Sequence, residues 1–103
     1  MKLLNKELCR TLPPLRSTDG DPEAMALAKF FTPDSSWTWY VVEFDGEDTF
    51  YGLVDGFELE FGYFSLRELE SVRGHFGLPI ERDLWFTPAP VRQLYDELLH
   101  KRF

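Results

Sequence analysis

The sequence predicts an α+β fold: an antiparallel four- to five-stranded meander sheet followed by two helices, with a short helix at the N-terminus. Three observations support this prediction. Aromatic and β-branched runs alternate with turn-forming residues between positions 24 and 64. A helix-start signal follows at Ser65, and apolar residues recur with helical spacing from Val91 onward. The length of 103 residues is typical of one domain, so we expect residues 1–103 to form a single domain.

The first predicted element is a short helix over about residues 5–10. Asn5 is a favoured N-cap residue, because its side-chain oxygen can accept a hydrogen bond from an amide of the first turn. Pro13 and Pro14 stop this helix, since proline has no amide hydrogen to donate. Residues 17–22 are rich in Ser, Asp, Gly and Pro, which is typical of an exposed loop.

Four strands follow, at about residues 25–32, 37–44, 49–54 and 57–64. The segments between them are turn-forming, and the strongest signal is Asp55-Gly56 between two aromatic runs. An Asp-Gly pair in that setting predicts a two-residue type I′ hairpin turn, because such a turn needs positive φ at both central positions. The run Leu84-Trp85-Phe86 could add a fifth strand at an edge.

The turn lengths assign side chains to faces, because residues paired across an antiparallel ladder share a face. A two-residue loop at Asp55-Gly56 places Phe50 opposite Phe61. The predicted core face then holds Ala28, Phe30, Trp37, Trp39, Val41, Phe50, Gly52, Val54, Phe57, Leu59, Phe61 and Tyr63. The opposite, mixed face holds Lys29, Thr38, Tyr40, Val42, Phe44, Tyr51, Leu53, Glu58 and Glu60.

Two further helices are predicted after the sheet. Ser65 and Glu68 form a capping-box pattern, and Gly74 is placed to supply a left-handed stop. The last helix is expected to open at Pro90 and run to about Lys101, with an apolar stripe made of Val91, Leu94, Tyr95 and Leu98.

The charge of the chain is concentrated in the predicted sheet. The chain has 18 Asp and Glu against 11 Lys and Arg, a net charge of -7, and its 44% hydrophobic content excludes a disordered acidic tail. Between Phe30 and Leu66 there are eight acidic residues, eleven aromatic residues and no Lys or Arg. An acidic balance argues against direct, sequence-independent binding of nucleic acid, which needs a surplus of Lys and Arg.

The acidic sheet has two functional interpretations. The favoured one is a non-enzymatic surface that binds a basic patch of a protein partner, with aromatic anchors on the mixed face. Its candidate contact residues are Tyr40, Phe44, Tyr51, Glu58, Glu60 and Arg82. The alternative is a metal-dependent enzyme that acts on nucleic acid or nucleotides, with Glu43, Asp45 and Asp48 as the weaker candidate ligands.

Other classes of site lack their residues. The chain has two His and one Cys, too few for a zinc site with cysteines, and no glycine-rich phosphate loop, so we expect no cofactor. The single Cys and the absence of an N-terminal apolar stretch favour the cytoplasm, and no window approaches the ~20 apolar residues of a membrane helix. Both a monomer and a homodimer that buries the mixed face remain open.

Several motifs resemble the bacterial domain-of-unknown-function family numbered 2958. They span most of the chain and include Phe30-Phe31-Thr32-Pro33-Asp34, Trp37-Thr38-Trp39-Tyr40, Glu43-Phe44-Asp45-Gly46, Tyr51-Gly52-Leu53-Val54, Gly62-Tyr63-Phe64-Ser65-Leu66, Val72-Arg73-Gly74 and Gly77-Leu78-Pro79-Ile80-Glu81-Arg82-Asp83. The resemblance implies a small cytoplasmic protein associated with plasmids, integrative elements and prophages, for which interference with a host defence system is one role. It implies no catalytic or binding residue.

Overall fold

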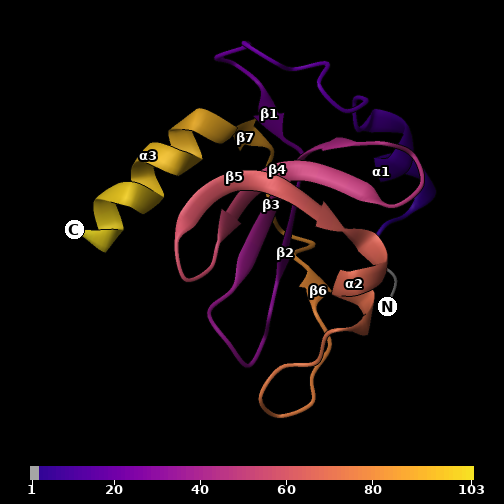
Figure 1. The fold of residues 1–103 in the computed structure, drawn as a ribbon, viewed down its shortest axis with the longest axis vertical. Helices are drawn as coiled ribbons and strands as arrows, with labels where there is room; N and C mark the ends of the chain where they lie inside the picture. Colours follow the sequence, from indigo (N-terminus) through magenta and orange to yellow (C-terminus); the bar gives the residue numbers. More distant parts are fainter. Residues whose placement is uncertain (1–2) are drawn as a thin grey trace.

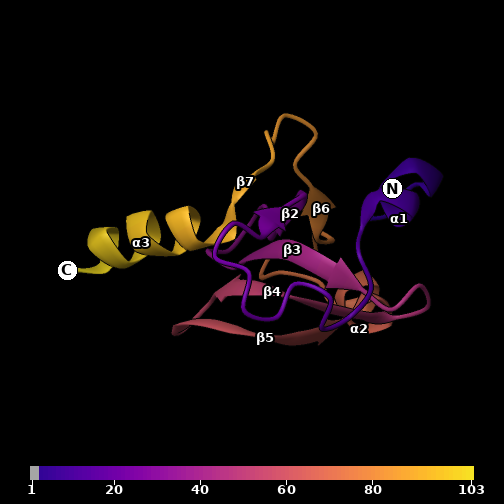
Figure 2. The same cartoon turned by 90° about the horizontal axis from the view of Figure 1, so that it is seen from above.

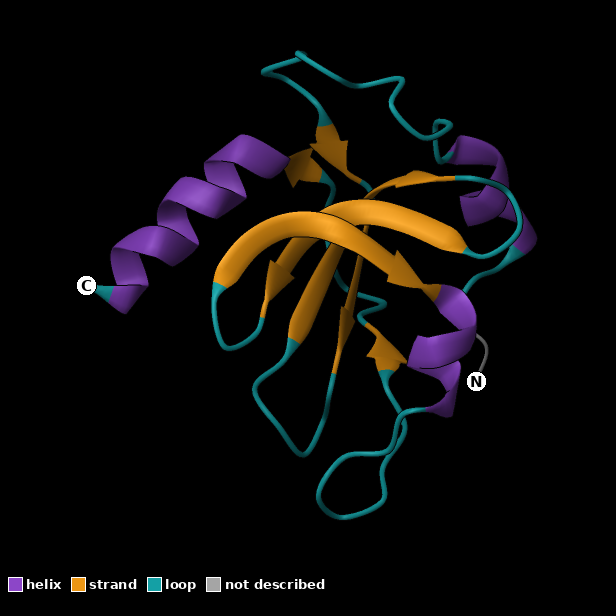
Figure 3. Ribbon diagram, in the orientation of Figure 1, coloured by secondary structure: helices purple, strands orange, loops and turns teal. Residues whose placement is uncertain are grey.

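The computed structural model describes residues 3–103 and confirms the α+β fold (Figures 1 and 3). A five-stranded antiparallel sheet has the strand order β5-β4-β3-β2-β6. Its strands are β2 (Ala28–Phe31), β3 (Thr38–Phe44), β4 (Thr49–Asp55), β5 (Leu59–Ser65) and β6 (Glu81–Arg82). A second antiparallel pair joins β1 (Met25–Ala26) to β7 (Ala89–Pro90).

The three helices are α1 (Lys6–Thr11), α2 (Leu66–Ser71) and α3 (Val91–Arg102). Both predicted caps are confirmed, since Asn5 accepts from the Leu8 amide at 2.8 Å and the Ser65 hydroxyl accepts from the Glu68 amide at 3.2 Å. The predicted left-handed stop at Gly74 is wrong, because α2 ends before it with Val72 as its C-cap. Gly74 instead lies against the Asp34 carboxylate, which leaves no room for a Cβ.

Two strand predictions also need correction. The run 25–32 is divided at Leu27, so that β1 leaves the main sheet and pairs with β7. The run Leu84-Trp85-Phe86 is not a strand but a turn. The Trp85 amide donates to the Asp83 carboxylate at 2.9 Å, and the Phe86 amide donates to the Asp83 carbonyl oxygen at 3.3 Å. The edge beyond β2 is formed by the two-residue strand β6 instead.

The main sheet carries a hydrophobic cluster on each face. The α2 side is the face covered by α1 and α2, and its buried residues are Leu3, Leu12, Ala28, Phe30, Trp39, Val41, Phe44, Phe50, Leu69 and Ile80. The α3 side is the face covered by α3, and its buried residues are Ala24, Ala26, Tyr40, Val42, Leu53 and Val91. Both faces are therefore partly core, and α3 stands at the opposite end of the molecule from α1 and α2 (Figure 1).

The hairpin between β4 and β5 is one residue longer than predicted. Asp55 pairs with Leu59, so residues 56–58 form a three-residue loop, and Gly56 does not have positive φ. Because side chains alternate along a strand, this change exchanges the two faces of β5. Phe61 and Tyr63 pair with Leu53 and Tyr51 and lie on the α3 side, whereas Glu60 pairs with Val54 and lies on the α2 side.

A β-bulge in β3 changes one more assignment. The register between β3 and β4 shifts between Val41 and Glu43, so two residues of β3 oppose one of β4. Beyond the bulge Phe44 pairs with Phe50 and enters the cluster on the α2 side, where the two rings stack at 4.6 Å. The same bulge directs Glu43 toward the loop 16–18.

Candidate functional site

Two of the predicted contact residues belong to the core. Tyr40 is 7% exposed and Phe44 is 5% exposed, so the expectation that they form an exposed surface is wrong. Tyr40 packs against Phe86 beneath the segment that leads into α3, with ring centroids 5.9 Å apart. Burial, and then the negative charges of Asp55 and Asp83, raise the pKa of the Tyr40 hydroxyl.

Arg82 is engaged within the chain. Its Nη1 donates to the Leu3 carbonyl oxygen at 2.6 Å and ties the segment before α1 to the sheet edge. The neighbouring charges Lys29 and Asp83 approach each other at 3.8 Å. Arg82 also lines a surface hollow of about 780 Å³, beside Lys6, Cys9 and Arg10.

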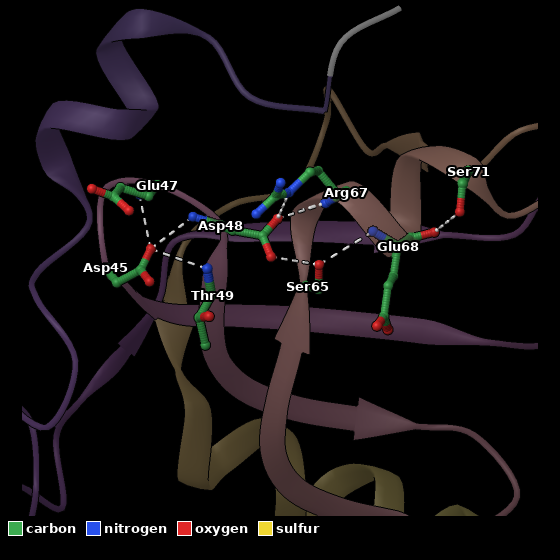
Figure 4. Close-up of polar contacts among 8 residues, drawn as sticks. All are labelled: Asp45, Glu47, Asp48, Thr49, Ser65, Arg67, Glu68 and Ser71. Carbon is green, nitrogen blue, oxygen red and sulfur yellow. Dashed lines mark hydrogen bonds and ion pairs between the residues drawn. The ribbon is translucent and has the colours of Figure 1, made fainter.

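The carboxylates of the three candidate metal ligands, Glu43, Asp45 and Asp48, each accept hydrogen bonds from backbone amides. Glu43 is 1% exposed and accepts from the Arg16 amide at 2.7 Å, from the Thr18 amide at 3.0 Å and from the Thr18 hydroxyl. Asp45 accepts from the amides of Glu47, Asp48 and Thr49 at 2.8–3.0 Å, and these bonds close the β3–β4 turn (Figure 4).

Asp48 joins that turn to the start of α2. Its carboxylate accepts from the Ser65 hydroxyl at 2.7 Å and from the Arg67 amide at 2.8 Å, and it also faces the Arg67 guanidinium at 3.4 Å (Figure 4). The Arg67 amide and the Ser65 hydroxyl lower the pKa of Asp48, and the turn amides, led by that of Glu47, lower the pKa of Asp45. Within residues 3–103, no three His, Cys, Asp or Glu side chains gather to hold a metal ion.

The structure brings together a different set of aromatic side chains. Tyr63, Tyr51, Phe61 and Tyr95 follow one another on the α3 side, with centroid distances of 5.2, 6.3 and 5.5 Å, and we call them the aromatic row. Tyr63 is 60% exposed and Phe61 is 40% exposed. The sequence predicts Tyr51 as a contact residue, whereas the two-residue hairpin that it favours places Phe61 and Tyr63 in the core.

A groove of about 400 Å³ runs beside the aromatic row. It lies between the loop 18–22, the sheet and the first turn of α3, and its lining includes Asp19, Asp21, Tyr51, Phe61 and Arg92. The buried Glu43 carboxylate fixes the loop that forms one wall. Partial burial raises the pKa of Tyr51, and the nearby charges of Glu43 and Asp19 add to the effect.

Glu58 and Glu60 remain at the surface, as predicted, but not on the predicted face. Glu58 lies in the β4–β5 loop, and Glu60 points to the α2 side of β5. Asp55 is bonded to Arg102 at 2.6 Å, while Glu58 and Glu60 take part in no ion pair within the described part of the chain. Strand β5 therefore carries the exposed rings of Phe61 and Tyr63 on one face and the exposed carboxylate of Glu60 on the other, with Glu58 just before its start.

The fold and this surface define a small α+β protein with an acidic and aromatic sheet edge. The chain belongs to the family described as Protein of unknown function (DUF2958), whose match covers residues 3–100. Comparisons with curated proteins and with solved structures give no match. Among the helices of residues 3–103, none is long and apolar enough to cross a membrane.

Proposed function

We propose that this protein is a non-enzymatic accessory protein that binds another protein through its acidic and aromatic sheet surface. The observation that carries the proposal is the aromatic row on β4 and β5, in which Tyr63 and Phe61 are 60% and 40% exposed. Aromatic side chains held on a rigid sheet supply much contact area with little loss of conformational entropy, and binding hot spots are enriched in them.

The charge of the same region indicates the kind of partner. Residues 31–65 contain eight acidic residues and no Lys or Arg, and Glu58 and Glu60 project from the start of β5. Complementary fields accelerate association and select among partners. The partner would therefore meet the β5 edge with basic groups toward Glu58 and Glu60 and with an apolar surface toward Phe61 and Tyr63 on the other face.

We extend the proposal to the setting in which this binding takes place. Resemblance to small proteins of plasmids, integrative elements and prophages supports a role in bacteria that carry mobile DNA, and we include interference with a host defence or restriction system in the proposal. A partner of this type would be a host protein with a basic, nucleic-acid-binding face, which the acidic surface would occupy in place of phosphates.

Affinity capture from the native host tests this function. The bait is compared with a Glu58→Lys/Glu60→Lys variant, and a Glu68→Lys/Glu70→Lys variant on α2 supplies the same change of net charge elsewhere on the surface. We expect a partner that is retained by the wild type and the α2 variant and lost by the β5 variant. A partner set unaffected by the β5 variant contradicts the proposal.

A further inference from the structure

Strand β5 is an open edge of the main sheet. It is seven residues long and, within residues 3–103, pairs with β4 alone, whereas the opposite edge strand β6 has two residues. Figure 2 shows β5 along the lower margin of the ribbon, with β4, β3 and β2 above it in that order. Native proteins usually blunt such edges with short strands, proline, bulges or charge, because an unpaired strand is a template for another strand.

The hydrogen bonds at the two ends of β5 show which backbone groups are free. The Leu66 amide donates to the Asp48 carbonyl at 2.8 Å, and the Gly56 amide donates to the Glu58 carbonyl at 3.1 Å. In an antiparallel ladder bonded pairs alternate with non-bonded pairs, so the bonded pairs between these ends are those of Phe64, Gly62 and Glu60 with β4.

The amides and carbonyls of Leu59, Phe61 and Tyr63 therefore point away from β4. Within the described residues, no hydrogen bond to a side chain or loop engages the backbone of Phe61 or Tyr63. The regular pairing of β4 with β5 contains no bulge, and β5 contains no proline. These positions offer two donors and two acceptors at the spacing that an added strand requires.

We propose that the β5 edge accepts an extended basic peptide segment of a partner as a sixth strand, an inference that rests on the proposed function and specifies its binding mode. Side chains of an added strand alternate between the two faces. Those on the α2 side would meet Glu60 and the neighbouring Glu58, which favours Lys or Arg. Those on the α3 side would meet Phe61 and Tyr63, which favours apolar residues.

Charge favours a basic peptide over a second copy of this chain as the strand that pairs with β5. Each copy carries a net charge of -7, and pairing two β5 edges would bring two acidic sheets together. A basic segment instead lowers the repulsion among the carboxylates that the edge already carries. The binding should accordingly weaken as salt is raised, since the glutamates are exposed.

Amide hydrogen exchange, followed residue by residue by NMR, tests the binding mode. The probe is an acetylated and amidated octapeptide of alternating Lys and Val, and its control alternates Glu and Val. We expect the Lys peptide to slow exchange at Phe61 and Tyr63 about tenfold or more, while Glu60, Gly62 and Phe64, already bonded to β4, change little. The Glu peptide should leave all five amides unchanged.

A backbone variant gives a second measurement. Tyr63→Pro removes an amide that points outward, which edge strands tolerate, and Tyr63→Ala removes the ring alone. We expect the proline variant to bind the Lys peptide about tenfold more weakly than the alanine variant. Retained slow exchange at Gly62 and Phe64 checks that the β4–β5 ladder is intact.

Three results would overturn the inference: no binding of the Lys peptide, binding without slower exchange at Phe61 and Tyr63, or slow exchange at both in a peptide-free homodimer. The proposed function fails separately, when the partner captured from the host is indifferent to the β5 charge reversal. A partner that is sensitive to that reversal, together with unprotected edge amides, would leave the function standing and reject strand addition.

Discussion

Replacing Glu43 by Gln should destabilise the protein and loosen one wall of the groove. The Glu43 carboxylate is 1% exposed and accepts three hydrogen bonds, from the Arg16 amide and from the amide and hydroxyl of Thr18. A glutamine keeps one acceptor oxygen and presents an NH₂ group to donors that it cannot satisfy. Hydrogen bonds to a charged group contribute about 1.5–3 kcal/mol each, so weakening them and leaving a donor unpaired should cost about 2–4 kcal/mol.

Urea denaturation measures this loss as a lower midpoint with an unchanged slope. The matched control is Glu47→Gln in the adjacent turn, where the side chain is exposed and only the backbone amide is used, and it should stay within about 0.5 kcal/mol of the wild type. Exchange of the Thr18 amide should also become faster in Glu43→Gln alone. A stability equal to that of the control variant, or an unchanged Thr18 amide, would refute the role given to this carboxylate.

Three further predictions follow from the sheet and its turns. Gly52→Ala should lower the free energy of unfolding by at least about 2 kcal/mol, because a Cβ at this position collides with the Tyr40 carbonyl. Gly62→Ala, directly opposite on β5, places its Cβ in open space and should be neutral or slightly stabilising. Equal urea denaturation midpoints for the two variants would contradict this packing. Because the pKa of Asp48 is lowered in the fold, its contribution is present above the ordinary value of 3.8 and is lost as the pH falls through the lower folded value. In thermal melts, the difference in Tm between the wild type and Asp48→Asn should therefore shrink as the pH falls below 3.8. A Tm difference that stays constant from pH 7 to pH 2 would contradict a stabilising role of the ionised Asp48 carboxylate. Phe57→Ser should lower the free energy of unfolding only slightly, since the Phe57 ring is 88% exposed and meets Trp37 in an edge-to-face contact. A loss above about 2 kcal/mol in urea denaturation would show that the hairpin depends on that contact.

Local chemistry predicted the elements well. Asn5 and Ser65 cap helices as expected, and Val91, Leu94, Tyr95 and Leu98 all pack on the sheet. The capping box is only half formed: the Ser65 hydroxyl accepts from the Glu68 amide, but within residues 3–103 the Glu68 carboxylate does not accept from the Ser65 amide. Asp48 from the β3–β4 turn also accepts from the Arg67 amide and the Ser65 hydroxyl. A residue distant in sequence thus completes the helix start, which no local pattern can show.

The assignment of side chains to the two faces of the sheet was less successful, because a single extra residue in a loop or strand exchanges the faces of everything that follows in that strand. The apolar residues of β4 and β5 occur at both odd and even positions, so the hydrophobic pattern does not choose between a two- and a three-residue hairpin. The bulge in β3 has no glycine or proline to mark it, and it alone moves Phe44 into the core. The hairpin length explains why the sequence assigns Phe61 and Tyr63 to the wrong face, and the bulge explains the same error for Phe44.

The charge analysis located the region of the candidate site but not its residues. Of the eight acidic residues between Phe30 and Leu66, Glu43, Asp45, Asp48 and Asp55 hold turns and loops together through hydrogen bonds or ion pairs. Asp34 likewise accepts from the Phe76 amide at 2.7 Å. An excess of acid in the sequence therefore overstates the number of carboxylates that are free to contact a partner. Three of the eight are exposed and make no side-chain hydrogen bond or ion pair within residues 3–103: Glu47 in the β3–β4 turn, Glu58 in the β4–β5 loop and Glu60 on β5.

The most direct test of the central claim is the Kd of the captured partner for a Tyr63→Ser variant. Phe76→Ser is the matched control, because Phe76 is 78% exposed on a loop outside the aromatic row. We expect Tyr63→Ser to weaken binding by about 30-fold, the effect of a hot spot worth about 2 kcal/mol, and Phe76→Ser to leave the Kd unchanged. Equal Kd values for Tyr63→Ser and the wild type would contradict the claim that this sheet edge is the binding surface.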